Sequence, residues 1–381
     1  MQTRVEADIR EQAKQLARTW QTRANELLTS EEEKIQQQMI RLLTNPADKI
    51  LLTKIIDQSF RPHNPERVAE RISTLLEEYG VPEFFGDVEK LLIQMFVGIG
   101  KHFPTFAVPK MIEQMRDSSS RAIIPGEAKA LQAHLHRRRD QNIRMNINHL
   151  GEAVLGEEEA AKRMQSYLRD MEDPDIEYIS IKISTLYSQI SSLAFDQTVA
   201  TLKRRLTRIY RAALANYFTR NDGSRVHKFV NLDMEEYRDL AITYQAFIST
   251  LEQEEFCDLS AGIVLQAYLP DSFPMQKKLT HWARQRVKTG GAPIKLRIVK
   301  GANMEMEKLE SSLFNWPLAP YDNKLEVDAN YKRMVRYGME RENIEAVNLG
   351  IASHNLFELA YAATLAEKNG VSEFFYFEML E

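Results

Sequence analysis

Four polar residues in four separate segments carry side chains suited to acid–base and charge-stabilising chemistry: Lys182, Asp233, Gln266 and Arg297. Each lies in a short run in which apolar and polar residues alternate. Because side chains in a strand point alternately to opposite faces, the polar residues of each run share one face. A fixed cation can bind a carboxylate or stabilise developing negative charge, and a nearby carboxylate can orient a proton. Since buried unpaired charges are costly, these groups should face one another or a charged ligand.

The segment that positions Arg297 is a predicted strand at residues 294–299, followed by a glycine turn and a helix. Its apolar face would meet the outer helices of a parallel barrel, so the opposite face, with Arg297, would look into the barrel. Lys300, Gly301 and Ala302 would then lie at the carboxyl end of the strand, where such barrels build their sites.

From about residue 141, strand-like runs alternate with helical ones, which is the pattern of βα units and a parallel sheet. The sequence predicts a helical part at residues 1–140 and an α/β barrel part at residues 141–381. The predicted strands cover residues 144–149, 177–183, 227–232, 262–268, 294–299, 346–351 and 374–377, which makes seven.

The first part of the chain is predicted to be helical, because its apolar residues recur at intervals of three and four. Ser30 with Glu33 has the spacing of a capping box and predicts the start of one helix. Asn45 followed by Pro46 predicts the N-cap and first turn of the next, and further helices are expected to about Asp140.

Composition limits the class of protein. A net charge of −4 over 381 residues gives no broad basic field, which argues against nucleic acid as the main partner. The single cysteine, Cys257, cannot form an internal disulfide, which fits a reducing compartment. The chain opens with polar, helix-forming residues, so no secretory signal is expected, and neither is a metal site.

Two further polar clusters lie near predicted strand ends. Ser353, His354 and Asn355 follow the sixth strand, and Lys324 and Asp328 stand four residues apart before it. Lys324 and Asp328 would share one face if their segment is helical. By itself, neither cluster predicts a site, because a structural histidine and a solvated helix pair are the more common roles.

Together these motifs resemble the proline dehydrogenase domain of the proline utilization A family. Members of that family are bifunctional flavoenzymes that also carry an aldehyde dehydrogenase domain. The helices before residue 141 resemble the arm and helical domain of the family more loosely. The segments that carry the resemblance, in family order, are NINHLGEAVLG (146–156), YISIKIS (178–184), KFVNLDMEEY (228–237), GIVLQAYLPDS (262–272), LRIVKGANMEMEK (296–308), KLEVDANYKRMV (324–335), IASHN (351–355) and FEMLE (377–381).

The resemblance implies a distorted (βα)8 barrel with non-covalent FAD across the carboxyl ends of its strands. By that match Arg297 contacts the flavin near N5, Gln266 its pyrimidine edge, and Lys324 faces the pyrophosphate. The other residues matched to the cofactor are Val299, Lys300, Gly301, Ala302, Ser353, His354, Asn355 and Glu378.

The resemblance further implies oxidation of L-proline to Δ1-pyrroline-5-carboxylate by hydride transfer from C5 to flavin N5, the first step of proline catabolism to glutamate. Lys182, Asp233 and Arg297 would be the catalytic residues. Lys182 and Asp233 would line the proline pocket. Lys182 would supply a cation for the carboxylate of proline, and Asp233 would orient either the pocket or the amine. Electrons would pass to a membrane quinone from a cytoplasmic protein, with peripheral membrane contact and oligomerisation left open.

The sequence departs from the family pattern in two places and at its end. Asn303, expected among the substrate-binding residues, replaces a common aromatic residue, and Val327 replaces a common threonine. Both replacements affect the expected shape of the wall of the proline pocket. The chain stops at Glu381, where the family continues into an eighth strand, a helix with paired arginines and later the aldehyde dehydrogenase domain. We therefore expect a fragment with an unclosed barrel that binds proline poorly by itself.

Two other classes stay open at this point. A lysine inside a barrel near a carboxylate, such as Lys182, also suits a Schiff-base lyase of the aldolase type. A non-catalytic scaffold, as a fragment of a larger enzyme, is the second. A flavin band that proline bleaches would indicate the proline dehydrogenase, and borohydride trapping with a carbonyl substrate would indicate the lyase. The scaffold predicts neither result.

Overall fold

The computed structural model describes residues 2–54, 65–80, 90, 128–149 and 153–380. Its internal contacts divide the chain into two compact units, one combining residues 1–19 with 126–380 and the other built from residues 20–125. The boundary that the sequence suggests between residues 140 and 141 stays a prediction.

The early part of the chain forms helices, and capping residues mark the starts of two of them. They are α1 (Gln2–Leu27), α2 (Ser30–Thr44), α3 (Pro46–Lys54) and α4 (Pro65–Tyr79). The predicted capping box at Ser30 and Glu33 is wrong by one residue, because Thr29 and Glu32 form it. Asn45 Oδ1 accepts a hydrogen bond from the amide of Ala47 at 3.0 Å, which confirms the N-cap predicted for α3. Helices expected between residues 81 and 127 lie outside the described residues.

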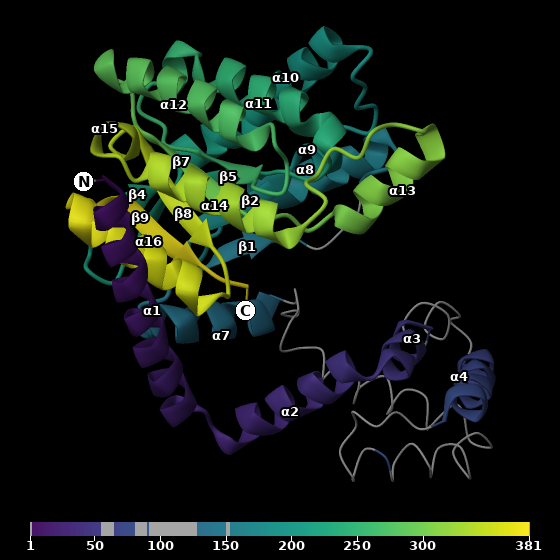
Figure 1. Cartoon of the computed structure of the whole chain (residues 1–381). Helices are drawn as coiled ribbons and strands as arrows, with labels where there is room; N and C mark the ends of the chain where they lie inside the picture. The colour runs from purple at the N-terminus through teal and green to yellow at the C-terminus, as the bar shows by residue number, and fades with distance from the viewer. Residues whose placement is uncertain (1, 55–64, 81–89, 91–127, 150–152, 381) are drawn as a thin grey trace. The chain divides into compact units, whose positions relative to one another are not determined.

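The larger unit is an α/β structure around one curled parallel sheet (Figure 1). Within the described residues this sheet has seven strands in the order β1-β2-β5-β6-β7-β8-β9, and every neighbouring pair is parallel. The α/β class and the seven predicted strands are confirmed. The bounds are β1 (Asn146–Asn148), β2 (Tyr178–Lys182), β5 (Phe229–Asp233), β6 (Gly262–Gln266), β7 (Ile294–Val299), β8 (Val347–Ala352) and β9 (Phe375–Glu378).

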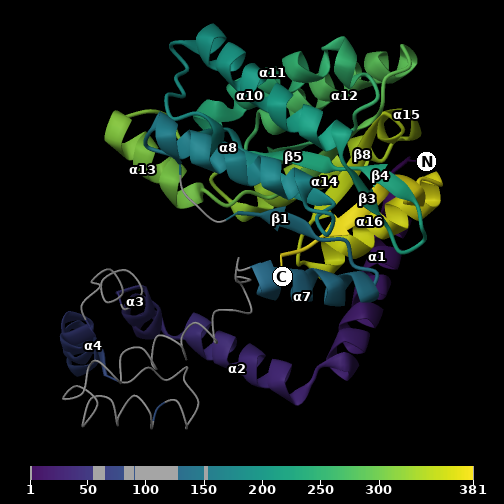
Figure 2. The same ribbon diagram turned by 180° about the vertical axis from the view of Figure 1, so that it is seen from behind.

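Helices between the strands cover the outer face of the sheet. Figures 1 and 2 show α10, α11 and α12 side by side, with α14 and α16 beside β7, β8 and β9. The helices of this unit after α1 are α7 (Ala128–Asp140), α8 (Glu157–Glu172), α9 (Ile183–Leu186), α10 (Phe195–Ala215), α11 (Leu240–Leu251), α12 (Ser272–Lys288), α13 (Met304–Phe314), α14 (Lys324–Gly338), α15 (Arg341–Ile344) and α16 (Leu356–Asn369).

Alternation along β7 fixes which side chains face inward. Ile294, Leu296 and Ile298 are fully buried, whereas Lys295, Arg297 and Val299 are only partly buried. The predicted two-faced strand is therefore confirmed, and its polar face carries the charged residues discussed below.

Several predicted strand bounds need correction. β6 ends at Gln266 rather than at residue 268, and β1 covers only Asn146–Asn148 of the predicted 144–149. β2 ends at Lys182, and Ile183 and Ser184 already belong to the short helix α9. His227 belongs to a separate antiparallel hairpin, β3 (Tyr217–Thr219) and β4 (Arg225–His227), and not to β5.

Lys228 separates the hairpin from β5. Its backbone amide donates to the carbonyl of Ala213 at 3.2 Å, which breaks the continuity between β4 and β5. The Lys228 side chain is 1% exposed, and Nζ donates to the carbonyls of Asp173 and Ile176. The lysine thus fastens the base of the hairpin to the loop before β2.

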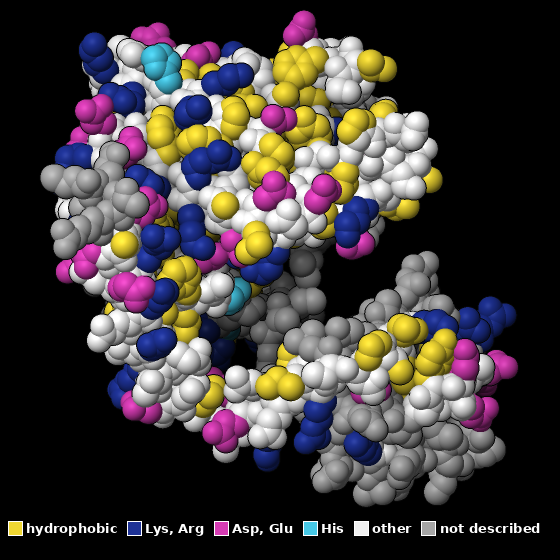
Figure 3. Space-filling view, in the orientation of Figure 1, with side chains coloured by type: hydrophobic (Ala, Val, Ile, Leu, Met, Phe, Trp, Pro, Cys, Tyr) yellow, Lys and Arg dark blue, Asp and Glu magenta, His cyan; other side chains and the backbone are white. Residues whose placement is uncertain are grey.

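Charges of both signs are interspersed over the face of the larger unit that Figure 3 shows, which agrees with the small net charge. None of the helices in the described ranges combines the length and hydropathy that a bilayer span requires.

Candidate active site

The centre of the candidate site is the guanidinium group of Arg297 on β7. Its Nε donates to Oε2 of Glu378 at 2.7 Å, Nη1 to Oδ1 of Asp233 at 2.9 Å, and Nη2 to the hydroxyl of Tyr178 at 2.8 Å. These partners come from β9, β5 and β2, so one side chain joins strands from across the sheet. Charge-assisted bonds of this length hold a guanidinium in a fixed orientation.

The two carboxylates beside Arg297 are in different electrostatic states. Burial raises the pKa of Asp233, although Arg297 opposes that shift. Burial also acts to raise the pKa of Glu378, but Lys295 and Arg297 together lower it below the ordinary value. Glu378 forms ion pairs with two cations, Lys295 and Arg297, whereas Asp233 pairs directly only with Arg297. This explains why the pKa is lowered in Glu378 and raised in Asp233.

Neutral polar side chains complete the surroundings of Asp233. Asn231 Nδ2 donates to Oδ1 at 2.8 Å, and Asn148 Nδ2 donates to Oδ2 at 3.1 Å. Because both Asp233 oxygens already accept hydrogen bonds, the carboxylate is held in place by three strands.

Lys182 lies at the end of β2 and pairs with Glu235 at 2.8 Å rather than directly with Asp233. Ser184 Oγ also donates to the Glu235 carboxylate. Gln266, 2% exposed at the end of β6, donates from Nε2 to the backbone carbonyl of Glu235 at 2.9 Å. The structure therefore brings the four sequence-predicted side chains together around residues 233–235.

The turn after β7 presents backbone more than side chains. Val299 is half-buried and pairs with Gln266 in the sheet. Gly301 has φ +128°, and a Cβ there would lie 2.5 Å from the ring of Tyr268, so only glycine fits. Ala302 is exposed, and Asn303 is the N-cap residue of α13 without a side-chain capping bond.

A second charged cluster lies beyond this turn. Lys300 Nζ is 2.6 Å from Asp328 Oδ1 and 2.7 Å from Glu358 Oε1. Lys324 Nζ is 2.7 Å from Asp328 Oδ2, which confirms that the two share a helix face, and its side chain is 75% exposed. Ser353 Oγ donates to Glu358 Oε2 at 3.1 Å.

The remaining residues of the β8–α16 loop lie at the surface. Asn355 is the N-cap of α16, and its side chain accepts from the amide of Phe357 at 3.0 Å. His354 is exposed between Ser353 and Asn355. Val327, one of the two departures from the family pattern, is buried in the first half of α14.

Several polar residues of the site were not among the predicted site residues: Tyr178, Glu235, Lys295 and Glu358. Tyr178 and Lys295 share the inward face with Lys182 and Arg297, so the same alternation of the strand could have identified them as site residues. Glu235 lies beyond the end of β5, where alternation no longer defines a direction. Glu358 is 3% exposed on α16, and only the tertiary structure brings it to Lys300.

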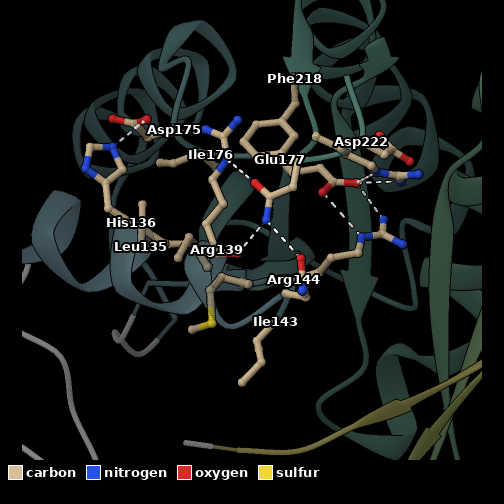
Figure 4. Close-up of a pocket in the computed structure, with 15 residues that line it drawn as sticks. Leu135, His136, Arg139, Ile143, Arg144, Asp175, Ile176, Glu177, Phe218 and Asp222 are labelled. Carbon is tan, nitrogen blue, oxygen red and sulfur yellow. Dashed lines mark hydrogen bonds and ion pairs between the residues drawn. The ribbon is translucent and has the colours of Figure 1, made fainter. Parts of the chain in front are cut away.

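A pocket at the opposite end of the strands contains none of the predicted site residues (Figure 4). It lies between α7, the start of β1 and the β3–β4 hairpin, and Glu177 accepts from Arg144 at 2.6 Å and from Arg220 at 2.7 Å within it. The Glu177 carboxylate is therefore already paired. Within the described part of the chain, His, Cys, Asp and Glu side chains form no cluster suited to a metal ion.

A parallel barrel-like sheet with an arginine-centred charged network at the carboxyl ends of its strands defines an α/β-barrel enzyme class. The chain belongs to the proline dehydrogenase family, whose model matches residues 131–381. The comparison with curated proteins finds no match.

Solved structures of proline utilization A proteins are similar to this chain. The protein from Corynebacterium freiburgense is 41% identical over 77% of this chain and 29% of its own, with a TM-score of 0.65. The protein from Bdellovibrio bacteriovorus inactivated by N-propargylglycine is 26% identical over 98% of this chain and 37% of its own, with a TM-score of 0.75. A Bradyrhizobium japonicum mutant, 18% identical with a TM-score of 0.62, shows the fold alone. The chain thus spans well under half the length of these proteins.

Proposed function

We propose that this chain is the proline dehydrogenase part of a proline utilization A protein, and that it oxidises L-proline to Δ1-pyrroline-5-carboxylate with FAD. The family match over residues 131–381 and the 41% identity to the Corynebacterium freiburgense protein support the proposal. The observation that carries it is the Arg297 guanidinium, which is held by Asp233, Glu378 and Tyr178 where such barrels react.

The residues present are suited to FAD. Gln266 Oε1 is buried and has no hydrogen-bond partner among the described residues, so it can accept from an N–H of a flavin ring. Gly301 is solvent-exposed, so its backbone can be approached from the solvent side, whereas the ring of Tyr268 occupies the position that a Cβ would take. Bound FAD would supply the acceptor for the hydride that leaves C5 of proline.

The roles that we propose toward FAD are those that the family resemblance implies. Arg297 would contact the flavin ring and Gln266 its pyrimidine edge, and Lys324, the more exposed partner of Asp328, would face the pyrophosphate. The residues proposed to line the rest of the cofactor are Val299, Lys300, Gly301, Ala302, Ser353, His354, Asn355 and Glu378. For Lys300 the contribution would come from its backbone, since two carboxylates hold its ammonium group.

Lys182 is proposed to bind the carboxylate of proline. Its side chain is 26% exposed and its ammonium group pairs with Glu235, so a substrate carboxylate would share or displace that partner without a change of strand position. Asn303, half-buried at the start of α13, is proposed to border the same substrate.

Asp233 is proposed to act on the amine. Since burial raises the pKa of its carboxyl group, Asp233 holds a proton more readily than an ordinary aspartate and is suited to orient the amine or accept its proton. Arg297, fixed by three partners, would stabilise the negative charge that develops nearby during the reaction, without reorganisation.

The wider setting is also a proposal. In this setting electrons pass on to a quinone, an aldehyde dehydrogenase domain of the full-length protein takes up the product, and the protein is cytoplasmic with peripheral contact to the inner membrane. The similar solved proteins, which are all much longer than this chain, support the second domain.

The decisive experiment is the visible absorption spectrum of the purified protein under anaerobic conditions. We expect a flavin band that L-proline bleaches and D-proline does not. A colourless protein that takes up no FAD, or a band that L-proline leaves unchanged, would contradict the proposal.

The same protein preparation tests the lyase alternative. Glu235 Oε1 lies 2.8 Å from Lys182 Nζ, so the nitrogen that would attack a carbonyl already has a carboxylate partner, and this contact disfavours a Schiff base. We expect no covalent adduct at Lys182 after treatment with borohydride and a carbonyl substrate.

A further inference from the structure

Lys295 is a buried cation that the proposed reaction does not use. It lies on β7 two residues before Arg297, on the same inward face, and its side chain is 13% exposed. Burial lowers the pKa of its ammonium group, and the partner Glu378 opposes that shift. A lysine kept inside a barrel at this cost needs a compensating role.

Lys295 and Arg297 share one carboxylate. Lys295 Nζ lies 2.5 Å from Oε1 of Glu378, and Arg297 Nε lies 2.7 Å from Oε2 of the same group. Each oxygen of Glu378 therefore has its own cation. Removal of Lys295 would leave a buried Glu378 that must share Arg297 with Asp233.

Aromatic rings lie beside the Lys295 ammonium group. Its Nζ is 4.9 Å from the ring centroid of Tyr178 and 5.5 Å from that of Tyr376, close enough for cation–π attraction. The Tyr178 hydroxyl accepts from Arg297, so one tyrosine touches both cations. Arg144, the other cation that acts on Lys295, lowers its pKa.

The backbone of β8 makes room for the shared carboxylate. A Cβ at Gly350 would lie 2.1 Å from Oε1 of Glu378 and 3.1 Å from Cε of Lys295. The pair therefore crosses β8 between β7 and β9 at a position that has no side chain.

We propose that Lys295 is a positioning residue that keeps Glu378 ionised and thereby holds Arg297 in the orientation the reaction requires. The role of Lys295 in the reaction rests on the proposed function. Its effect on the ionisation of Glu378 depends only on the folded structure. Without Lys295, desolvation favours a protonated Glu378, and the charge-assisted bond to Arg297 weakens.

The test is a double-mutant cycle of Lys295→Met and Glu378→Gln in the FAD-loaded chain, with Lys162→Met, half of the exposed Lys162–Glu158 pair, as control. We expect K295M to lower kcat for proline at least about tenfold while KM changes less than about threefold, because the loss lies in orientation rather than uniform binding. In K295M/E378Q, the side-chain amide carbonyl introduced by E378Q can still accept from Arg297, so kcat should recover part of the loss.

Unfolding between pH 5 and 9 provides a readout that needs neither flavin nor proline. In K295M the pKa of Glu378 becomes raised, so stability should fall as pH rises from the ordinary glutamate value through the raised one. All four proteins should share the fall near pH 6 that the raised pKa of Asp239 causes, but the wild-type, E378Q and double variants should lack the additional fall due to Glu378. The proposal would be overturned if the free-energy losses of the two single variants simply add in the double variant. It would also be overturned if the stability of K295M depends on pH as that of wild type does.

The cycle stays decisive if K295M does not fold. In that case recovery of folded protein in K295M/E378Q supports the coupling, and failure to recover overturns it. A protein without bound flavin would defeat the proposed function, but the pH-dependent step in K295M would still stand or fall separately.

Discussion

Gly350 on β8 lies directly beneath the carboxylate of Glu378 on β9, where a Cβ would come within 2.1 Å of Oε1. Glu378 cannot move aside freely, because Lys295 and Arg297 hold its two oxygens. The absence of a side chain at one position of β8 is thus a condition for the charged network at the site.

We expect Gly350→Ala to break this arrangement. The added methyl group should displace Glu378 and reduce stability by about 1–3 kcal/mol, as overpacking of a filled interior does. The rate of proline oxidation should fall as well. Chemical unfolding and steady-state kinetics measure the two effects. Gly156→Ala is the matched control, since no described atom lies within 4 Å of a Cβ there. Equal stability of the two variants would contradict the packing argument.

Arg297→Lys should preserve the charge but not the geometry. A lysine cannot reproduce the three directed bonds to Glu378, Asp233 and Tyr178, so we expect kcat/KM for proline to fall by about 100-fold or more. Steady-state kinetics with the FAD-loaded variant measures this. A loss below about threefold would show that the fork of the guanidinium is not required.

Lys182→Met should act on substrate binding. We expect a rise of at least about tenfold in KM for proline, because the proposed cation for the carboxylate is gone. The Kd of a carboxylate-bearing competitor should rise in parallel, and that of the uncharged analogue should not. Lys324→Met, a change in the second charged cluster, should instead weaken retention of FAD. The prediction fails if the two variants exchange these phenotypes.

Asp239, in the short turn before α11, should make stability depend on pH. Burial, aided by Glu235, Glu307 and Glu310 and opposed by Arg238, raises the pKa of Asp239 from 3.8 to about 6. An acid whose folded-state pKa is raised contributes stability below its unfolded value, and this is lost as the pH rises through about 6. Asp239→Asn should therefore gain about 1–3 kcal/mol at pH 8 relative to wild type.

Unfolding free energies at pH 4 and pH 8 check this prediction, with Asp222→Asn as control. Asp222 is exposed in the hairpin turn, and the hydroxyl and amide of Ser224 lower the pKa of its carboxyl group. Its replacement should not raise stability at pH 8. A gain at pH 8 for Asp222→Asn, or none for Asp239→Asn, would count against burial as the cause.

Strand alternation predicted Arg297 at the centre of the site and its partner Asp233, but not the partner that lies beyond a strand end. In β7 the alternation is complete, so the inward direction of Arg297 could be read from the sequence. Lys182 and Asp233 stand at the last positions of their strands, where the same rule still holds. Glu235 lies two residues past β5, and its contact with Lys182 depends on a loop path that no periodicity encodes.

The errors have similar physical causes. Thr29 and Ser30 are both good N-caps, and only the backbone conformation decides that Thr29 closes the box with Glu32. The β3–β4 hairpin escaped prediction because each of its strands has three residues, too few for a recognisable alternation. Its end therefore merged with β5 in the sequence pattern.

The anchoring of that hairpin has a practical consequence for labelling the protein. Lys228 ties its base to the loop before β2, while residues 221–224 at its tip are exposed and lie at the amino ends of the strands, away from Arg297. An affinity tag or fluorophore inserted between Asp222 and Gly223 would therefore be attached to an exposed turn whose base is held in place by Lys228. We expect such an insertion to leave the chemistry of the protein undisturbed.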